Sequence, residues 1–132
     1  MSKIDLIDYP NNCFSYDNET YEQGLRDKWK QQRLERGFDD TELWNLDVTI
    51  IKFVLPRLKA FAAEPTAGYS CAGYPCCLEQ DYPDCKDYNK LWWYNIIPEM
   101  IKGLEEYLDD SSLDDEPEGM KLFFKYFTAL WT

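Results

Sequence analysis

Residues 40–63 restrict the fold more than any other segment, because a helix over this range carries apolar side chains on most of its faces. The apolar residues are Leu43, Trp44, Leu46, Val48, Ile50, Ile51, Phe53, Val54, Leu55, Leu58 and Phe61. A single polar strip remains at helical spacing, and Pro56 falls on it. A helix that is apolar nearly all round is usually buried, so this one is expected at the centre of the fold. Asp39 followed by Glu42 predicts a capping box at its start.

A helix is also expected over 18–36, capped by Asp17 or Asn18 and ended by Gly37. A narrow apolar stripe recurs at every fourth residue, at Tyr21, Leu25 and Trp29. The second half of the segment is basic, with Arg26, Lys28, Lys30, Arg33 and Arg36. We interpret these cations as a solvated face, which suits the negative end of a helix.

Two further amphipathic segments, 88–110 and 117–131, complete a set of about four helices. Pro98 lies toward the polar side of the first, so either a kink or a break into two shorter helices is expected there. The residues of the second that are expected to face inward are Met120, Phe123, Phe124, Phe127, Leu130 and Trp131. Residues 1–16 are expected to form a turn or an extended arm. The chain is therefore predicted to be all-α, with one domain over 1–132 that forms an irregular bundle with a long Cys-rich loop at 64–87.

The chain is strongly acidic: 25 Asp and Glu against 14 Lys and Arg give 132 residues a formal net charge of −11. This charge disfavours direct binding to nucleic acid, which requires cations, and disfavours attraction to anionic membranes. It favours solubility and steering toward basic partners. No leader-like or membrane-spanning apolar run is present, so a cytoplasmic location is expected.

Residues 105–118 carry eight acidic residues and no basic one, where a helix is expected to end. Carboxylates do not favour the negative end of a helix, so we interpret the run as functional. The expected partner-binding residues are Glu99, Glu105, Glu106, Asp109, Asp110, Asp114, Asp115 and Glu116. Residues 91–94 are apolar or aromatic at four successive positions, so Trp92 and Tyr94 are candidate exposed anchors of an interface. The alternative is that the Cys-rich loop covers them.

The Cys-rich loop has the spacing C-x4-C-C-x7-C, formed by Cys71, Cys76, Cys77 and Cys85. Four thiolates are able to hold a structural zinc ion that would order the loop. The spacing differs from the common zinc-binding pairs, and adjacent cysteines seldom ligate one ion together. The other interpretation is a set of partly buried free thiols beside tyrosines. No cofactor is expected, with structural zinc as the open alternative.

The chain contains no histidine, which excludes Ser–His and Cys–His nucleophile pairs. It also lacks the Gly-rich phosphate-binding motifs and the metalloprotease motif, so it is not expected to be an enzyme. Asp47 is expected on the apolar side of the 40–63 helix, where a buried charge needs a partner or a raised pKa. Arg57 lies on the same side, too far along the helix to pair with it. A structural ion pair for Asp47 is favoured over a catalytic role.

Three stretches together carry a resemblance: 42–47 (ELWNLD) leading to 55–59 (LPRLK), 93–101 (WYNIIPEMI) and 118–131 (EGMKLFFKYFTALW). They resemble a group of small acidic proteins encoded by bacteriophages and prophages, which has no assigned activity, over about 42–131. The resemblance implies a phage accessory protein in the host bacterial cytoplasm. It supplies no catalytic residue.

The leading hypothesis is an anti-CRISPR-like inhibitor that binds a host nucleic-acid-binding defence protein by acidic mimicry of nucleic acid. The expected partner is a host protein with a basic surface, such as a CRISPR effector or another defence nuclease. One alternative is a phage structural or assembly protein that acts by oligomerisation. Another is a small-molecule sponge with Asp47 and the Cys-rich loop lining its pocket. The sequence leaves the oligomeric state open.

Overall fold

The computed structural model describes residues 14–63, 73–109 and 115–131. Within these ranges every regular element is helical, which confirms the all-α fold class. The chain divides into two compact units, Met1–Phe53 (unit 1) and Val54–Thr132 (unit 2). Each unit is described by itself, and the single domain stays a prediction. Most of the expected N-terminal arm lies outside the described residues.

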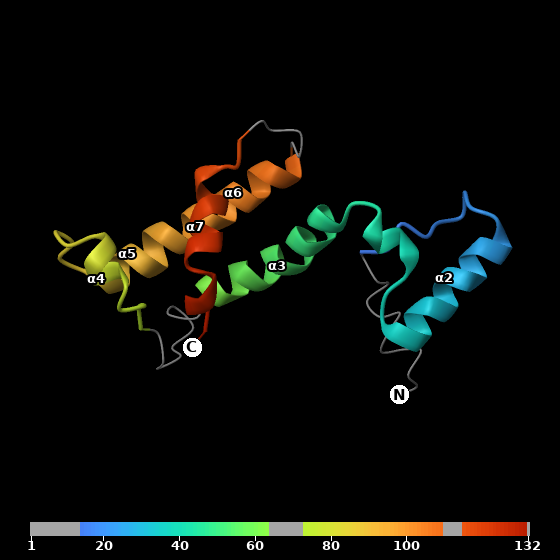
Figure 1. Ribbon diagram of the computed structural model, residues 1–132, viewed down its shortest axis with the longest axis horizontal. Helices are drawn as coiled ribbons and strands as arrows, with labels where there is room; N and C mark the ends of the chain where they lie inside the picture. The colour runs from blue at the N-terminus through green and yellow to red at the C-terminus, as the bar shows by residue number, and fades with distance from the viewer. Residues whose placement is uncertain (1–13, 64–72, 110–114, 132) are drawn as a thin grey trace. The chain divides into compact units, whose positions relative to one another are not determined.

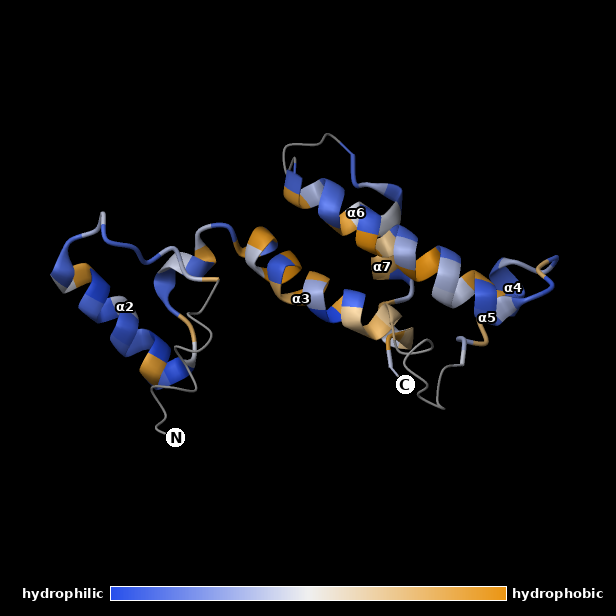
Figure 2. Cartoon of the chain, turned by 180° about the vertical axis from the view of Figure 1, so that it is seen from behind, coloured by the Kyte–Doolittle hydropathy of each residue, from blue (hydrophilic) through white to orange (hydrophobic). Residues whose placement is uncertain are grey.

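Unit 1 contains α2 (Gln23–Arg36), the 3₁₀ turn η1 (Asp40–Leu43) and the first half of α3 (Leu46–Ala62). Unit 2 contains the second half of α3 and the elements that follow it (Figure 1). These elements are α4 (Leu78–Asp81), α5 (Tyr88–Leu91), the π turn η2 (Trp92–Ile96), α6 (Ile97–Asp109), α7 (Glu118–Lys125) and the 3₁₀ turn η3 (Phe127–Ala129). Hydrophobic residues recur along α3 and α6, whereas α2 is mostly hydrophilic (Figure 2).

Helix α2 ends where expected but begins later, at Gln23 rather than near Asn18. The side chain of Asn18 accepts a hydrogen bond from the backbone N–H of Thr20 at 2.9 Å, and such a local turn competes with helix formation. The C-terminal prediction is confirmed: Gly37 has φ 85°, in the left-handed region, and its N–H bonds the carbonyl oxygen of Arg33.

The capping box is confirmed, but it begins the short turn η1 instead of one long helix. Asp39 accepts from the backbone N–H of Thr41 at 2.9 Å, and Glu42 accepts from the N–H of Asp39 at 2.7 Å. Because α3 then begins at Leu46, Asp47 falls in its first turn, where a carboxylate complements the positive helix end. The expectation that Asp47 is buried is therefore wrong, since its side chain is exposed, as is that of Arg57.

Pro98 neither breaks the helical path nor ends it, because a π turn precedes it. The N–H of Ile97 bonds the carbonyl oxygen of Trp92, five residues earlier. Proline lacks an N–H and crowds the carbonyl four residues before it, and the wider turn accommodates both defects. The extra residue turns Trp92 and Trp93 inward together, at 1% and 4% exposure. The expected exposure of Trp92 is thus wrong, whereas Tyr94 is 57% exposed.

Helix α7 crosses α6 at two buried glycines, Gly103 and Gly119 (Figure 1). A Cβ atom on Gly103 would lie 2.5 Å from the backbone nitrogen of Met120. A Cβ atom on Gly119 would lie far inside contact distance of the carbonyl oxygen of Glu99. Only glycine allows two backbones to approach this closely. The crossing therefore fixes which face of α6 is turned outward.

Hydrogen bonds attach the described part of the Cys-rich loop to buried aromatic residues of unit 2. The buried Tyr126 hydroxyl donates to Asp81 at 2.7 Å, and its ring meets Trp92 edge-on at 5.6 Å. Trp93 Nε1 donates to the carbonyl oxygen of Gly73 at 2.8 Å. Three residues that were expected to face inward are instead exposed: Phe124, Phe127 and Trp131. Phe124 adjoins the buried Phe123, so only one of the two rings reaches the core. Phe127 and Trp131 follow the end of α7 and therefore no longer have its helical spacing.

Candidate partner-binding surfaces

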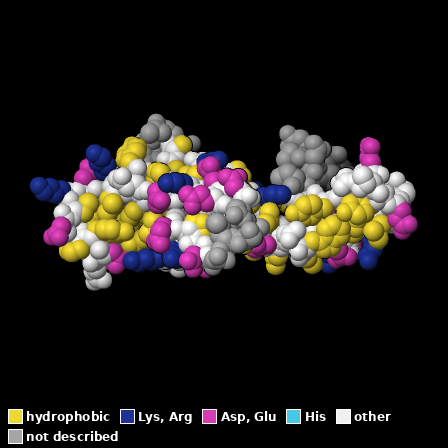
Figure 3. Space-filling model, turned by 90° about the horizontal axis from the view of Figure 1, so that it is seen from above, with side chains coloured by type: hydrophobic (Ala, Val, Ile, Leu, Met, Phe, Trp, Pro, Cys, Tyr) yellow, Lys and Arg dark blue, Asp and Glu magenta, His cyan; other side chains and the backbone are white. Residues whose placement is uncertain are grey.

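The outward side of α6 carries the acidic face, which we define as Glu99, Glu105, Glu106 and Asp109. All four residues are exposed, whereas Ile97, Met100 and Leu104 on the other side of the helix are buried. Lys102 is the basic residue among them. Acidic side chains interspersed with basic ones are visible over unit 2 in Figure 3. The structure thus places four of the predicted partner-binding residues together on one helix.

The protein's own cations neutralise only part of this acidic surface. Lys59 Nζ lies 3.4 Å from Glu105, and Lys121 Nζ lies 3.2 Å from Glu118. Both pairs are exposed, and such pairs contribute little stability. In the ranges that the structure describes, no ion pair includes Glu99, Glu106 or Asp109. These three carboxylates remain available to a partner.

The remaining predicted acidic residues lie between α6 and α7. Asp115 and Glu116 are exposed and precede Pro117 at the start of α7. Asp110 and Asp114 lie outside the described residues. The acidic run is therefore divided: Glu105, Glu106 and Asp109 lie on α6, and Glu118 begins α7.

Unit 1 presents an apolar face that the sequence did not predict. It consists of Leu43, Trp44, Leu46, Ile50 and Phe53, each 48–52% exposed. The three that belong to α3, Leu46, Ile50 and Phe53, lie opposite the buried Ile51 and Leu55. Segment 14–16 covers part of the face, with the Phe14 and Phe53 rings 6.1 Å apart and the Tyr16 and Trp44 rings stacked at 5.9 Å. Hydrophobic side chains also reach the surface of this unit in Figure 3.

The apolar face corrects the prediction that the 40–63 helix is buried all round. A continuous apolar pattern shows that a helix has two apolar sides, but only the tertiary structure shows whether both are covered. Contiguous exposed apolar residues are typical of interaction sites in folded proteins. This face is therefore a second candidate surface.

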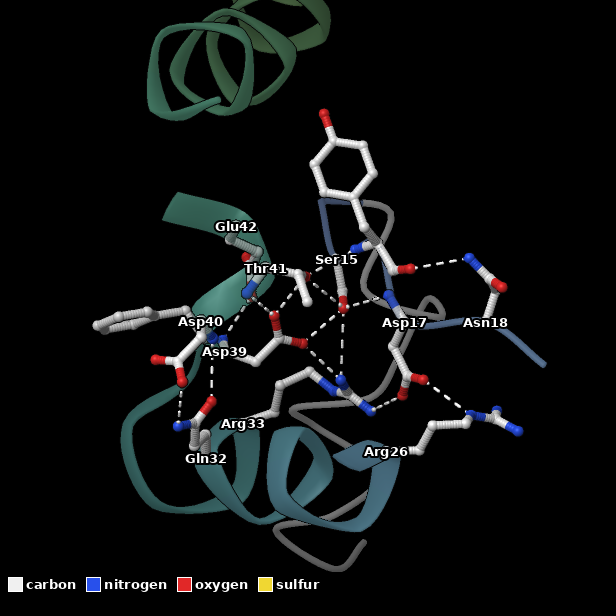
Figure 4. A network of polar contacts seen from close by, with 12 residues as sticks. Ser15, Asp17, Asn18, Arg26, Gln32, Arg33, Asp39, Asp40, Thr41 and Glu42 are labelled. Carbon is white, nitrogen blue, oxygen red and sulfur yellow. Dashed lines mark hydrogen bonds and ion pairs between the residues drawn. The ribbon is translucent and has the colours of Figure 1, made fainter. Parts of the chain in front are cut away.

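A buried ion pair between Arg33 and Asp39 organises the interior of unit 1 (Figure 4). Arg33 Nη1 lies 2.6 Å from Asp39 Oδ2, and Arg33 Nη2 lies 3.2 Å from Asp17. Asp39 also accepts from the hydroxyl groups of Ser15 and Thr41, each at 2.5 Å. Its side chain is completely buried. The ion pair joins α2 to the start of η1, and the contacts of Ser15 and Asp17 add the segment before α2.

The Arg33–Asp39 network satisfies its charges and hydrogen bonds within unit 1. Burial by itself raises the pKa of Asp39, but hydrogen bonds from Ser15, Thr41 and Arg33 outweigh burial and hold that pKa below its ordinary value. No buried side-chain N or O atom in the described part of the chain lacks a hydrogen-bond partner. Arg33 was expected on a solvated face and is buried instead. The sequence contains a signal for this burial: Arg33 is the next member of the stripe that recurs at every fourth residue and includes Trp29.

The described cysteines are free thiols: Cys76 and Cys77 are exposed, and Cys85 is half-buried. Cys71 lies outside the described residues. Among the residues that are described, no group of three or more Cys, Asp or Glu side chains is arranged to hold a metal ion. The four-cysteine zinc site stays a prediction.

Comparisons with protein-family models, curated proteins and solved structures give no match for this chain. The resemblance to phage-encoded acidic proteins also stays a prediction. None of the helices in the described ranges combines the length and hydropathy that a membrane-crossing segment requires.

Proposed function

We propose that this protein binds the cationic surface of a nucleic-acid-binding protein and excludes nucleic acid from it. The observation that carries the proposal is the exposed set Glu99, Glu106 and Asp109 on α6, with no ion pair to the rest of the described chain. The Gly103–Gly119 crossing holds that helix in place. Carboxylates on a rigid support attract the Lys and Arg side chains that otherwise contact phosphates.

The partner class follows from charge and from the resemblance. A net charge of −11 favours association with a basic protein surface. The resemblance to phage-encoded proteins supports a host defence protein in the bacterial cytoplasm, such as a CRISPR effector or another defence nuclease. The proposed role is inhibition by occupancy, which requires no catalytic residue in this chain.

Reversing the charge of the three unpaired carboxylates tests the proposal. The triple variant Glu99→Lys, Glu106→Lys and Asp109→Lys changes the charge of α6 by six units and should weaken partner binding at least a hundredfold at physiological salt, about 2.7 kcal/mol. The immobilised protein is exposed to a bacterial host lysate. Bound proteins are eluted with double-stranded DNA and identified by mass spectrometry.

The control triple reverses the exposed carboxylates Glu19, Glu22 and Glu35 of unit 1, which changes net charge equally. It should retain the DNA-eluted proteins. Loss of binding in both triples would show that net charge, not the acidic face, drives capture. Capture that DNA does not displace, or that survives reversal of the acidic face, overturns the proposal.

A second candidate function, assembly through oligomerisation, is favoured by the apolar face of unit 1. Five large apolar side chains at about half exposure are costly to leave in water. Two copies that pack this face together would bury it in a two-fold interface. Apolar contact, unlike charge attraction, persists at high salt.

If copies associate through the apolar face, Ile50→Glu should weaken self-association at least tenfold, because it buries two unpaired charges per dimer. Sedimentation equilibrium in high salt measures the dissociation constant. Phe124→Glu, at an exposed position in unit 2, is the matched control variant and should leave the dissociation constant unchanged. A wild-type protein that remains monomeric at the highest attainable concentration excludes this function.

A further inference from the structure

Unit 2 contains a small hollow with an aromatic lining. Its volume is about 100 Å³, and its lining residues are Gly73, Tyr74, Pro75, Trp92, Ala129 and Trp131. This is about three times the share of one water in the liquid, ~30 Å³. It is well below the ~300 Å³ at which sites for drug-sized ligands begin. The hollow therefore admits the end of one side chain rather than a nucleotide or a cofactor.

Contacts with the rest of unit 2 hold two of the lining residues, Gly73 and Tyr74, in place. The Trp93 indole fixes the backbone of Gly73 at 2.8 Å. The Tyr74 ring stacks on Tyr88 at 5.3 Å, and its hydroxyl donates to Glu79 at 2.8 Å. At the exposed end Trp131 is 76% accessible, so its ring can cover an incoming group.

The overall charge of unit 2 and the aromatic lining of the hollow both favour a cation. The segment that contains Tyr74 continues through four exposed carboxylates, Glu79, Asp81, Asp84 and Asp87, and one basic residue, Lys86. Asp81 also pairs with Lys125 at 3.6 Å, so three of the four carboxylates have no ion pair within the described residues. Residues 54–132 as a whole carry seven basic and fourteen acidic residues. The faces of Trp and Tyr rings also attract cations through their quadrupoles. Both effects act in the same direction, whereas neither favours a neutral or anionic group.

We propose that this hollow receives the guanidinium group of a single arginine from the partner protein. A guanidinium is flat, stacks on aromatic faces and is more weakly hydrated than an ammonium, so it suits a small hollow with aromatic residues in its lining better than lysine does. The inference rests on the proposed function only in taking the arginine from that partner. An arginine anchor would give the acidic surface a specific contact in addition to charge attraction.

The test uses the full chain and two small probes that differ in charge. N-acetyl-arginine methylamide and its neutral citrulline counterpart are titrated separately, and the indole N–H signals of the tryptophans are followed by NMR. The arginine probe should shift the Trp92 and Trp131 signals saturably. The citrulline probe should bind at least tenfold more weakly.

Trp131→Ala removes an exposed side chain that lines the hollow and should weaken binding of the arginine probe at least tenfold. Phe124→Ala removes an exposed ring of the same unit outside the hollow and should have no effect. Equal binding of both probes shows a site for neutral groups and overturns the proposal. Absence of saturable shifts, or unchanged binding in Trp131→Ala, overturns it as well.

The same titration separates this proposal from the proposed function. The α6 triple Glu99→Lys, Glu106→Lys and Asp109→Lys should still bind the arginine probe, because none of these residues lines the hollow. If DNA-displaced capture fails while the probe binds, the mimicry proposal fails and the arginine site stands. If capture behaves as expected while the probe does not bind, the arginine site fails alone.

Discussion

Gly119→Ala should lower the free energy of unfolding of unit 2 by about 3 kcal/mol or more, the upper range for overpacking a closed site. A methyl group at this position meets the carbonyl oxygen of Glu99, which belongs to the backbone of α6 and has no rotamer that avoids the contact. Helices α6 and α7 must then separate, which exposes buried residues such as Met120. Urea unfolding followed through the indole signals of Trp92 and Trp93 measures the loss.

Gly24→Ala is the matched control, because it makes the same chemical change in open space. No heavy atom lies within 4 Å of a Cβ placed on Gly24, which is exposed within α2. Alanine there should stabilise unit 1 by about 0.5–1 kcal/mol, since glycine is the less favourable residue inside a helix. Equal unfolding midpoints for Gly119→Ala and the wild type would contradict the close crossing.

Asp39→Ala should destabilise unit 1 by about 3–5 kcal/mol, the usual cost of removing one partner of a buried ion pair. The substitution leaves the Arg33 guanidinium buried without its closest carboxylate, and it removes the acceptor of the Thr41 hydrogen bonds. The described part of unit 1 has few other buried apolar side chains, Trp29 and Ile51 among them, so a loss of this size should unfold the unit. The indole signals of Trp29 and Trp44 report the unfolding.

The adjacent Asp40 provides the control, since its side chain, which contacts Gln32 and Arg36, is 42% exposed and Asp40→Ala should have a much smaller effect. Removing both charges, as Arg33→Met with Asp39→Leu, should recover part of the lost stability because no unpaired charge remains. If Asp39→Ala were as stable as the wild type, the Arg33–Asp39 pair would not organise unit 1.

The pH dependence of unit 1 gives a second measure of the same group. The folded-state pKa of Asp39 is lowered from an ordinary value of 3.8, so its ionised form stabilises the folded state above that pH. This contribution is lost as the pH falls from 3.8 through the folded-state pKa. Wild-type unit 1 should therefore lose stability more steeply in that range than Asp39→Asn does. Parallel slopes would contradict the assignment.

The features that the sequence predicted correctly depend on neighbours along the chain. The Gly37 helix end and the Asp39–Glu42 capping box involve residues within four positions of one another, and the polar side of α6 follows from 3.6-residue periodicity. Contacts between residues this close in the chain can be predicted from the amino-acid sequence. Those predictions needed no knowledge of which helix packs on which.

The features that were missed depend on tertiary packing. The exposure of Ile50 opposite the buried Ile51 is decided by which side of α3 finds a neighbour. The burial of Trp92 depends on a π turn, which shifts the helical register by one residue. The Gly103–Gly119 crossing joins positions on two helices, and neither glycine alone distinguishes close packing from flexibility.

The π turn η2 also determines which way the charges of α6 point. An α-helix advances by about 100° per residue, so the residue added before Pro98 rotates everything after it relative to α5. A variant with one residue deleted between Trp92 and Ile96 would keep a continuous helix, but its Glu99, Glu106 and Asp109 would point in a different direction relative to α5. The number of residues in this one turn thus sets the direction in which the acidic side of α6 points, whichever acidic residues follow it.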